Sequence, residues 1–292
     1  MKTIFDSKKV KVVLSVMLYL VGLLFYSCGG QINNLQQDQY LITQLTNLPA
    51  KTNKIQKDKV VSNWQRRNID GAYINSNTAA AEYTTGLENG YVRWGNILEA
   101  ENIDITKPAP DGKLLDFAEG FTYKVTGDNI FKEEMYKNIP AGYKTIIQWL
   151  VWDAVGIETY GLMYLDSLKL NIPFQPGYFN SNLTCNIENL GTIGLKSLVI
   201  TWVGNSKMNG KNCAVIQYQS FFNPVDAVNN GMKIKGRSLY WGTIWISLDE
   251  PQVECGALNE DLPMELTIPG VPEKQLIDLQ RQVEFTKVSG QR

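Results

Sequence analysis

The chain contains no histidine among its 292 residues. Without an imidazole it cannot assemble Ser-His-Asp or Cys-His nucleophile systems, and most transition-metal sites lose their commonest ligand. The phosphate-binding patterns G-x-x-x-x-G-K-[ST] and G-x-G-x-x-G are absent as well. The sequence therefore predicts no metal site and no cofactor, and it favours a protein that is not an enzyme.

Carboxylate chemistry, as in glycoside hydrolysis, is the one catalytic class that the composition still allows. On a helix, Asp153 and Glu158 would lie about 140° apart, and Glu158 and Asp166 about 12 Å apart along the axis. Paired catalytic carboxylates need roughly 5–9.5 Å. Glu260 and Asp261 would point to opposite faces of a strand. A carbohydrate-active protein is therefore the least favoured of three candidate functions.

The chain has little excess charge of either sign and no cluster of basic residues. It contains 28 lysines and arginines against 29 aspartates and glutamates. The sequence therefore lacks the concentrated positive charge that binding to nucleic acid or to an anionic lipid surface requires. The apolar content of 44% points to a folded globular body rather than to disorder.

Cysteine is scarce too, with four residues in the chain. Apart from Cys28, which is considered below, these are Cys185, Cys213 and Cys255. A Cys185–Cys213 bridge across neighbouring strands is one interpretation, and three buried thiols that behave as small hydrophobic side chains is the other. Their spacings match no zinc pattern.

The longest hydrophobic run, Val12–Tyr26, follows the basic stretch Lys8-Lys9-Val10-Lys11. As a helix it would be about 23 Å long, whereas a bilayer core is roughly 30 Å thick. The run is therefore sized for the core of a signal peptide rather than for a permanent membrane anchor.

The run ends in Phe25-Tyr26-Ser27-Cys28, which resembles the lipobox of a bacterial lipoprotein signal. The resemblance implies that Cys28 carries a lipid, such as palmitate, and holds the mature protein on a membrane. A plain secretory signal and an uncleaved anchor remain as alternatives. A mature chain beginning at Cys28 would carry 24 basic and 28 acidic residues, a net charge of −4.

The predicted organisation has three parts: a signal peptide at 1–27, a polar tether at 28–60 and a single domain at 61–292. Leucines at roughly helical spacing predict a short amphipathic helix in the tether before Pro49. No acidic cluster follows Cys28, which favours the outer membrane and a periplasm-facing position over the cell exterior.

The pattern of the globular part changes near Pro173. Before it, apolar residues at helical spacing predict a wide-faced, buried helix over 145–168, in which Gly156 and Gly161 weaken the helix or permit close contact. After it, the period falls to two, and Asn209-Gly210 predicts a hairpin turn. The predicted strands are 91–97, 121–125, 183–190, 195–203, 213–222, 232–235, 239–248, 253–258, 263–268 and 283–288.

The strand at 239–248 is apolar on both faces. Gly242, Ile244 and Ile246 form an ordinary core face, while Trp241, Thr243 and Trp245 occupy the opposite one. Trp202 adds a further tryptophan on the strand at 195–203. Apolar residues on both faces predict a sheet that is covered on both sides. The cover is either the helix, as a closed core, or a ligand in an open apolar cavity, which makes these three residues and Trp202 candidate ligand-binding residues.

These elements predict an α+β fold, a curved antiparallel β-sheet in a half-barrel-like meander packed on a long apolar helix. With its lipoprotein signal, the chain resembles in pattern the half-barrel carriers of the LolA, LolB and LppX type. That resemblance implies an acyl chain or another lipid between a concave sheet and helices.

The leading functional hypothesis is a non-enzymatic envelope lipoprotein that binds an apolar or amphipathic ligand. The alternative is a structural or partner-binding subunit of an envelope protein complex.

Overall fold

The computed structural model describes Leu45 and residues 54–126, 129–177, 183–188, 190–229 and 231–288. The predicted signal peptide, Cys28 and the greater part of the predicted tether lie outside these residues. The described strands are β1 (Gln56–Asn68), β2 (Tyr73–Thr85), β3 (Val92–Asn102), β4 (Lys113–Leu114), β5 (Thr122–Tyr123), β6 (Leu183–Ile187), β7 (Gly191–Leu195), β8 (Val199–Met208), β9 (Lys211–Asn229), β10 (Met232–Ser247), β11 (Val253–Thr267) and β12 (Gln275–Lys287).

The described α-helix is α2 (Lys144–Leu162). Short 3-10 helices cover Glu88–Gly90, Asp116–Ala118, Asn129–Phe131, Glu133–Tyr136, Ala141–Tyr143 and Leu165–Ser167. The predicted helix is confirmed, but it ends at Leu162, and the last of these 3-10 helices replaces its C-terminal turn.

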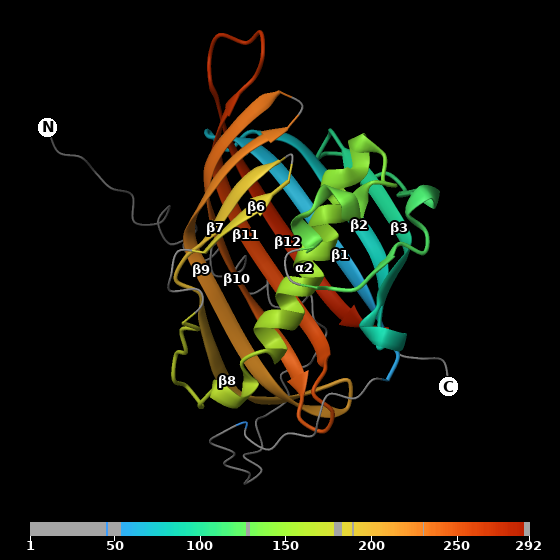
Figure 1. Cartoon of the computed structure of the whole chain (residues 1–292). Helices are drawn as coiled ribbons and strands as arrows, with labels where there is room; N and C mark the ends of the chain where they lie inside the picture. Colours follow the sequence, from blue (N-terminus) through green and yellow to red (C-terminus); the bar gives the residue numbers. More distant parts are fainter. Residues whose placement is uncertain are drawn as a thin grey trace, which may run out of the picture. The chain divides into compact units, whose positions relative to one another are not determined.

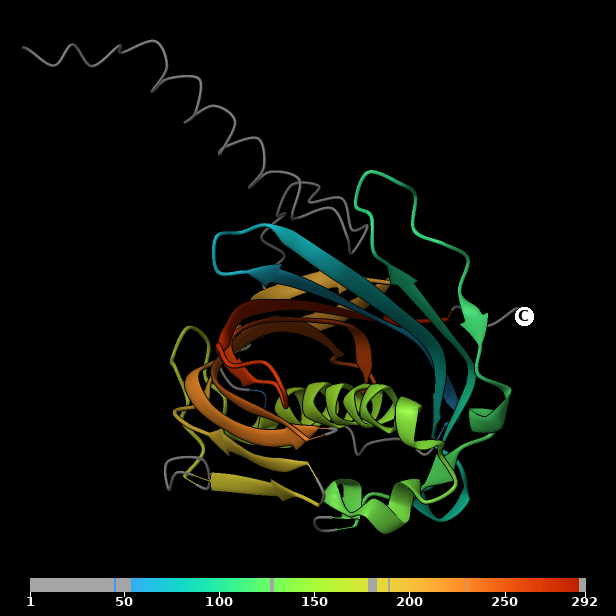
Figure 2. The ribbon, with the colours of Figure 1, turned by 90° about the horizontal axis from the view of Figure 1, so that it is seen from above.

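The strands form one 12-stranded sheet in the order β4-β3-β2-β1-β12-β11-β10-β9-β7-β6. β5 pairs with β3, and β8 pairs with β9. The pairings between named strands are antiparallel. Figures 1 and 2 show this sheet curling around α2, so that the helix lies in its concave face. The coarse prediction of an α+β fold with a curved antiparallel sheet holds.

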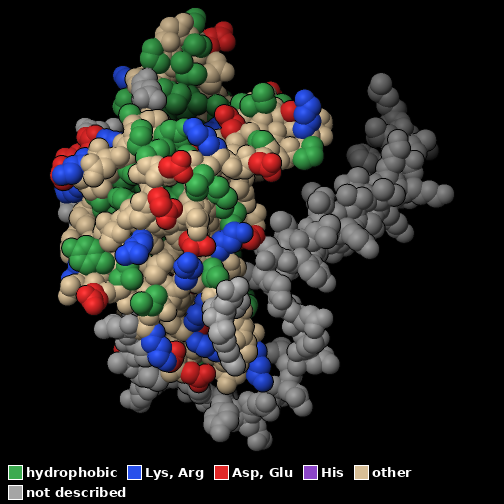
Figure 3. Space-filling model, turned by 90° about the vertical axis from the view of Figure 1, so that its right-hand side faces the viewer, with side chains coloured by type: hydrophobic (Ala, Val, Ile, Leu, Met, Phe, Trp, Pro, Cys, Tyr) green, Lys and Arg blue, Asp and Glu red, His purple; other side chains and the backbone are tan. Residues whose placement is uncertain are grey.

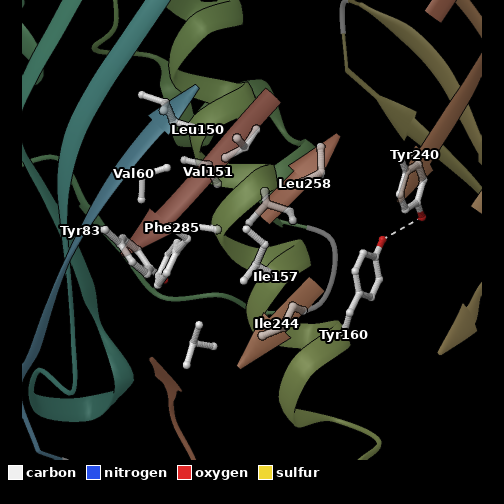
Figure 4. Close-up of a cluster of buried hydrophobic side chains, with 14 of the residues drawn as sticks. Val60, Tyr83, Leu150, Val151, Ile157, Tyr160, Tyr240, Ile244, Leu258 and Phe285 are labelled. Carbon is white, nitrogen blue, oxygen red and sulfur yellow. Dashed lines mark hydrogen bonds between the residues drawn. The ribbon is translucent and has the colours of Figure 1, made fainter. Parts of the chain in front are cut away.

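The core is the layer between α2 and the concave face. Leu150, Val151 and Ile157 of the helix pack among side chains from strands far apart in the sequence, which include Val60, Leu258 and Phe285 (Figure 4). At the far end of the helix, the Tyr160 and Tyr240 hydroxyl groups lie 3.0 Å apart in a hydrogen bond. One apolar helix thus supplies one side of the core that the sheet encloses.

Several predicted strand boundaries were wrong. β1 begins at Gln56, so residues 56–60 of the predicted tether belong to the sheet. The two predicted strands at 232–235 and 239–248 are one strand, β10, and those at 253–258 and 263–268 are one strand, β11. The predicted strand at 195–203 is divided between β7 and β8.

Two local predictions can be compared directly with the structure. Asn209 and Gly210 both have positive φ, at 52° and 78°, and they join β8 to β9 as the hairpin pattern predicts. Cys185 and Cys213 both carry free thiols, so the Cys185–Cys213 bridge does not form. Cys255 is disulfide-bonded, so the interpretation of three free, buried thiols is wrong as well.

Gly161 permits the close contact between α2 and β10. A Cβ atom at this position would lie 2.8 Å from Ile246 Cδ1 and 3.0 Å from Ile244 Cγ2. We expect Gly161→Val to lower the free energy of unfolding by about 1–3 kcal/mol, because it overpacks this contact. Urea denaturation of the purified protein measures the change.

Gly156→Ala is the matched control on the same helix. Its Cβ would meet Tyr160 Cε2 at 3.6 Å, an ordinary contact. Alanine should therefore raise stability by about 0.5–1 kcal/mol through helix propensity. Equal effects of the two substitutions would contradict the assigned packing.

Candidate functional site

A cavity of about 220 Å³ lies between the N-terminal half of α2 and the concave face of the sheet. It is at the end of the sheet where the hairpins β1–β2, β9–β10 and β11–β12 turn. A cavity needs only about 10–15 Å³ to hold one water molecule. This space is therefore large enough for an organic ligand group rather than for a single buried water.

Most of the cavity wall is aliphatic. Inward-facing residues of five neighbouring strands supply it: Ile193 of β7, Val225 and Ala227 of β9, Met232 and Ile234 of β10, Leu262, Met264 and Leu266 of β11, and Ile277 and Leu279 of β12. They recur at every second position because alternate side chains of a strand point to the same face. The wall is the continuation of the core face beyond the start of the helix.

Two indoles of α2, from Trp149 and Trp152, form the opposite wall. The Trp152 Nε1 atom donates a hydrogen bond to the carbonyl oxygen of Ile130 at 3.0 Å. The Trp149 ring lies 5.4 Å from the Trp64 ring and 5.5 Å from the Arg281 guanidinium carbon. Both indoles are therefore held in place by contacts with the surrounding protein.

A buried ion cluster contributes Arg281 and Glu260 to the lining of the cavity. The Arg281 Nη1 atom lies 2.5 and 2.7 Å from the two carboxylate oxygens of Asp153, and its Nε atom donates to Glu260 Oε2 at 2.7 Å. The Ser238 hydroxyl also bonds to Glu260. The cluster joins α2, which carries Asp153, to β11 and β12.

Both signs of charge persist in this cluster at neutral pH. Burial raises the pKa of Asp153 to about 6 against the opposing effect of Arg281, so its carboxylate is ionised at neutral pH. Burial alone would lower the pKa of Arg281, but Asp153 and Glu260 outweigh it and hold that pKa above its usual range. Two carboxylates thus compensate one guanidinium.

A second arginine, Arg66 of β1, lies at the edge of the cavity next to Leu279 in the strand register. Its Nη1 atom donates to the side-chain oxygens of Asn75 and Asn77, at 3.0 and 2.7 Å. Both partners are neutral amides. Arg66 therefore has a different environment from Arg281, although both line the same cavity.

The structure does not bring the predicted ligand-binding residues together. Trp202 is fully buried on the core side, where its indole N–H donates to Gly204 O and Asn205 Oδ1. Trp241, Thr243 and Trp245 lie on the convex face instead, because the alternate residue Ile244 faces α2.

The convex-face residues do not line this cavity. Trp241 is 38% exposed. The Trp245 indole N–H donates to Ser206 Oγ of β8, so a neighbouring strand covers it in part. The faces of β10 are as predicted, with Ile244 and Ile246 toward the core, but the structure covers the opposite face only in part, and ligand binding at these residues stays a prediction.

Sequence reasoning missed the residues that do line the cavity. Trp149 and Trp152 stand three positions apart on one helix, and the alternating apolar residues of β11 and β12 share one face. These two patterns were the available signal. Asp153 and Glu260, from different carboxylate pairs in the sequence argument, meet through Arg281 rather than across an open cleft.

A more open hollow of about 420 Å³ lies elsewhere, lined by Glu133, Glu134, Lys137, Lys144 and Glu188. Ion pairs link Lys137 to Glu134 and Lys144 to Glu133. Its charges are therefore engaged with one another, and it offers little apolar surface. The face in Figure 3 likewise intersperses acidic and basic side chains, with hydrophobic side chains gathered mainly toward its upper half.

Within the described part of the chain, no cluster of three or more acidic or cysteine side chains is placed to hold a metal ion. The same residues include no helix with the length and hydrophobicity needed to cross a membrane.

No protein-family model matches the sequence, and no curated protein matches it. A solved structure of lipovitellin, described for its lipid–protein interactions, aligns with 83% of this chain and 26% of its own, at 10% identity and a TM-score of 0.38. A DUF1329 family protein from Desulfovibrio piger aligns with 85% of this chain and 89% of its own, at 7% identity and a TM-score of 0.14.

This chain spans about a quarter of the lipovitellin chain that it matches. Both TM-scores are too low to assign a shared fold. Function is therefore inferred below from the sequence and the geometry of this chain alone.

The opposite end of the concave face holds a buried carboxyl group. Asp58 is 1% exposed, and its Oδ1 atom accepts a hydrogen bond from Gln56 Nε2 at 2.7 Å. Its Oδ2 atom has no hydrogen-bond partner among the described residues. Burial, partly opposed by the Gln56 hydrogen bond and reinforced by the nearby Glu158 carboxylate, raises the pKa of Asp58 to about 7.

A raised carboxyl pKa makes stability fall as pH rises. Between the unfolded value of 3.8 and the folded value of about 7, the folded state binds the proton and the unfolded state does not. At 1.36 kcal/mol per pKa unit, Asp58 should remove about 2–3 kcal/mol of stability between pH 5 and 7. Asp58→Asn should abolish this part of the decrease.

Urea denaturation at about pH 5 and about pH 7 measures the difference between the two proteins. Asp111→Asn, at an exposed loop position, is the control and should keep the pH dependence of the unchanged protein. The same slope in the Asp58→Asn variant and the unchanged protein would contradict the assignment.

Proposed function

We propose that this protein is a non-enzymatic envelope lipoprotein that binds an apolar or amphipathic molecule, such as an acyl chain, between α2 and its curved sheet. The observation that carries the proposal is the aliphatic cavity, walled by inward-facing residues of β7, β9, β10, β11 and β12 and by two indoles of α2. Ligand sites typically combine such apolar walls with a few polar groups.

The shape of the wall supports a chain-like ligand. From β12 to β7 it crosses five neighbouring strands, a path of about 19 Å at a strand spacing of about 4.8 Å. Its charged groups, Arg66, Glu260 and Arg281, come from β1, β11 and β12 on one side, and the other polar lining residues, Thr145, Thr192 and Asn229, are neutral. A long apolar body with one polar end matches this distribution.

A binding role without chemistry is supported by the state of the nearby acids. Asp153 and Glu260 are both paired with Arg281, so neither carboxylate is directed into the cavity as an unpaired acid or base.

Filling the cavity should abolish binding. Ala227 is buried and lines the cavity, so Ala227→Phe places a ring in the space that a ligand would occupy. We expect at least a tenfold weaker affinity for the uncharged fluorophore N-phenylnaphthylamine, because the ring displaces several methylene groups of apolar contact. Fluorescence titration of the purified protein measures it.

Val228→Phe is the matched control, since the adjacent residue is exposed on the other face of β9. It should leave the affinity within about twofold, and circular dichroism checks that both variants fold. Equal affinity in all three proteins would overturn the assignment of the cavity as the ligand site.

We further propose that Cys28 carries the lipid and holds the protein on the outer membrane, facing the periplasm. The lysine-led apolar run and the sequence Phe25-Tyr26-Ser27-Cys28 support this.

Labelling of expressing cells with a clickable fatty acid should mark the unchanged protein and not the Cys28→Ala variant. Ser27→Ala, which keeps a small residue beside the modified position, should retain the label. An unlabelled protein, or label that survives Cys28→Ala, would favour the secretory or uncleaved alternatives.

A further inference from the structure

Arg66 is the one cavity-lining charge that the described residues do not compensate. The cavity is lined by Arg66, Arg281 and Glu260. Arg281 is paired with both Glu260 and Asp153. No carboxylate in the described segments forms a salt bridge with Arg66, so one positive charge at the cavity has no directly paired acid.

The guanidinium of Arg66 also has donors to spare. A guanidinium carries five N–H groups. Its Nη1 atom makes the two hydrogen bonds to Asn75 and Asn77, and no described acceptor is bonded to Nε or Nη2. The acid in this network, Glu101, accepts a hydrogen bond from Asn75 Nδ2 at 2.8 Å, and its carboxylate acts on Arg66 from a distance rather than through a direct hydrogen bond.

Arg66 lies at one end of the aliphatic wall, where it could hold one end of a bound ligand. It faces Leu279 across the β1–β12 ladder, and the apolar residues of β12, β11 and β10 continue from there. Burial lowers the pKa of Arg66, with the Glu101 carboxylate opposing it, so the cation here is poorly compensated. A ligand anion would supply both the missing charge and the missing acceptors.

We propose that Arg66 binds the anionic head group of a single-chain amphiphile whose apolar chain occupies the cavity. This inference rests on the proposed function and adds the charge of the ligand. The planar guanidinium fits a carboxylate or a phosphate through paired hydrogen bonds. The head group therefore belongs to a fatty acid or to an alkyl phosphate, two sources of the same anionic chemistry.

Displacement of N-phenylnaphthylamine from the full-length protein tests this inference. The competitors share a dodecyl-length chain and differ in the head: dodecanoate, dodecyl phosphate, dodecanol and dodecyltrimethylammonium. At about pH 8 we expect at least one anion to bind about tenfold more tightly than the alcohol, the size of one charge-assisted hydrogen bond, and the cation to bind most weakly. The order of the two anions identifies the source.

Arg66→Gln should weaken the preferred anion about tenfold and leave dodecanol within about twofold. Arg66→Lys keeps the charge without the planar fork and should retain part of the preference. Arg67→Gln is the matched control, because Arg67 bonds to Gln65 and Gly71 and does not line the cavity. Its profile should equal that of the unchanged protein.

The outcomes separate the two proposals. If the alcohol binds as tightly as both anions, or if Arg66→Gln weakens alcohol and anions equally, the anionic head group is overturned while the apolar site stands. If the fluorophore binds neither the unchanged protein nor the control, both proposals fail together.

Discussion

The structure depends on one mismatch of length between a helix and the sheet that surrounds it. A helix of 19 residues is about 28 Å long, whereas a strand of 19 residues, such as β9, spans about 63 Å before curvature. One helix cannot cover the concave face of strands that long. The concave face of the sheet carries further apolar side chains beside and beyond the N-terminal half of the helix, and the space that these side chains face is the cavity. The filled core and the open cavity, two competing readings of the sequence, are therefore both present at different ends of one sheet.

The Arg281 cluster marks the boundary between those two ends. Burying an ion pair is costly, and hydrophobic replacements of equal volume are often as stable. The cluster instead fixes the relative positions of three elements, because Asp153 comes from α2, Glu260 from β11 and Arg281 from β12. Because the three groups must meet, they restrict how far α2 can slide or turn in the sheet. The same guanidinium lies against Trp149, so the ion cluster also sets one wall of the cavity.

The sequence predicted those elements whose local pattern was unambiguous. The apolar helix and the Asn209-Gly210 turn are examples, since one face or one backbone conformation dominates each. β1 was not predicted as a strand because its buried face is partly polar, with Gln56, Asp58 and Ser62 facing inward. β11 was divided at Pro263, a residue that usually ends a strand, although here it is paired with Asp278 inside the ladder.

The site was missed for a related reason. A strand that is apolar on both faces, such as β10, does not reveal which face is concave, and the large tryptophans turned out to lie on the convex side. Tryptophan size is a weak guide, because aromatic area stabilises a core, a cross-strand contact and a ligand site equally well. A half-buried cation is more selective evidence. Its desolvation has a cost that a directly paired anion offsets most fully, and the described chain supplies such an anion to Arg281, whereas the direct partners of Arg66 are two amides. The asymmetry between two arginines of one cavity therefore says more about the ligand than the aromatic residues do.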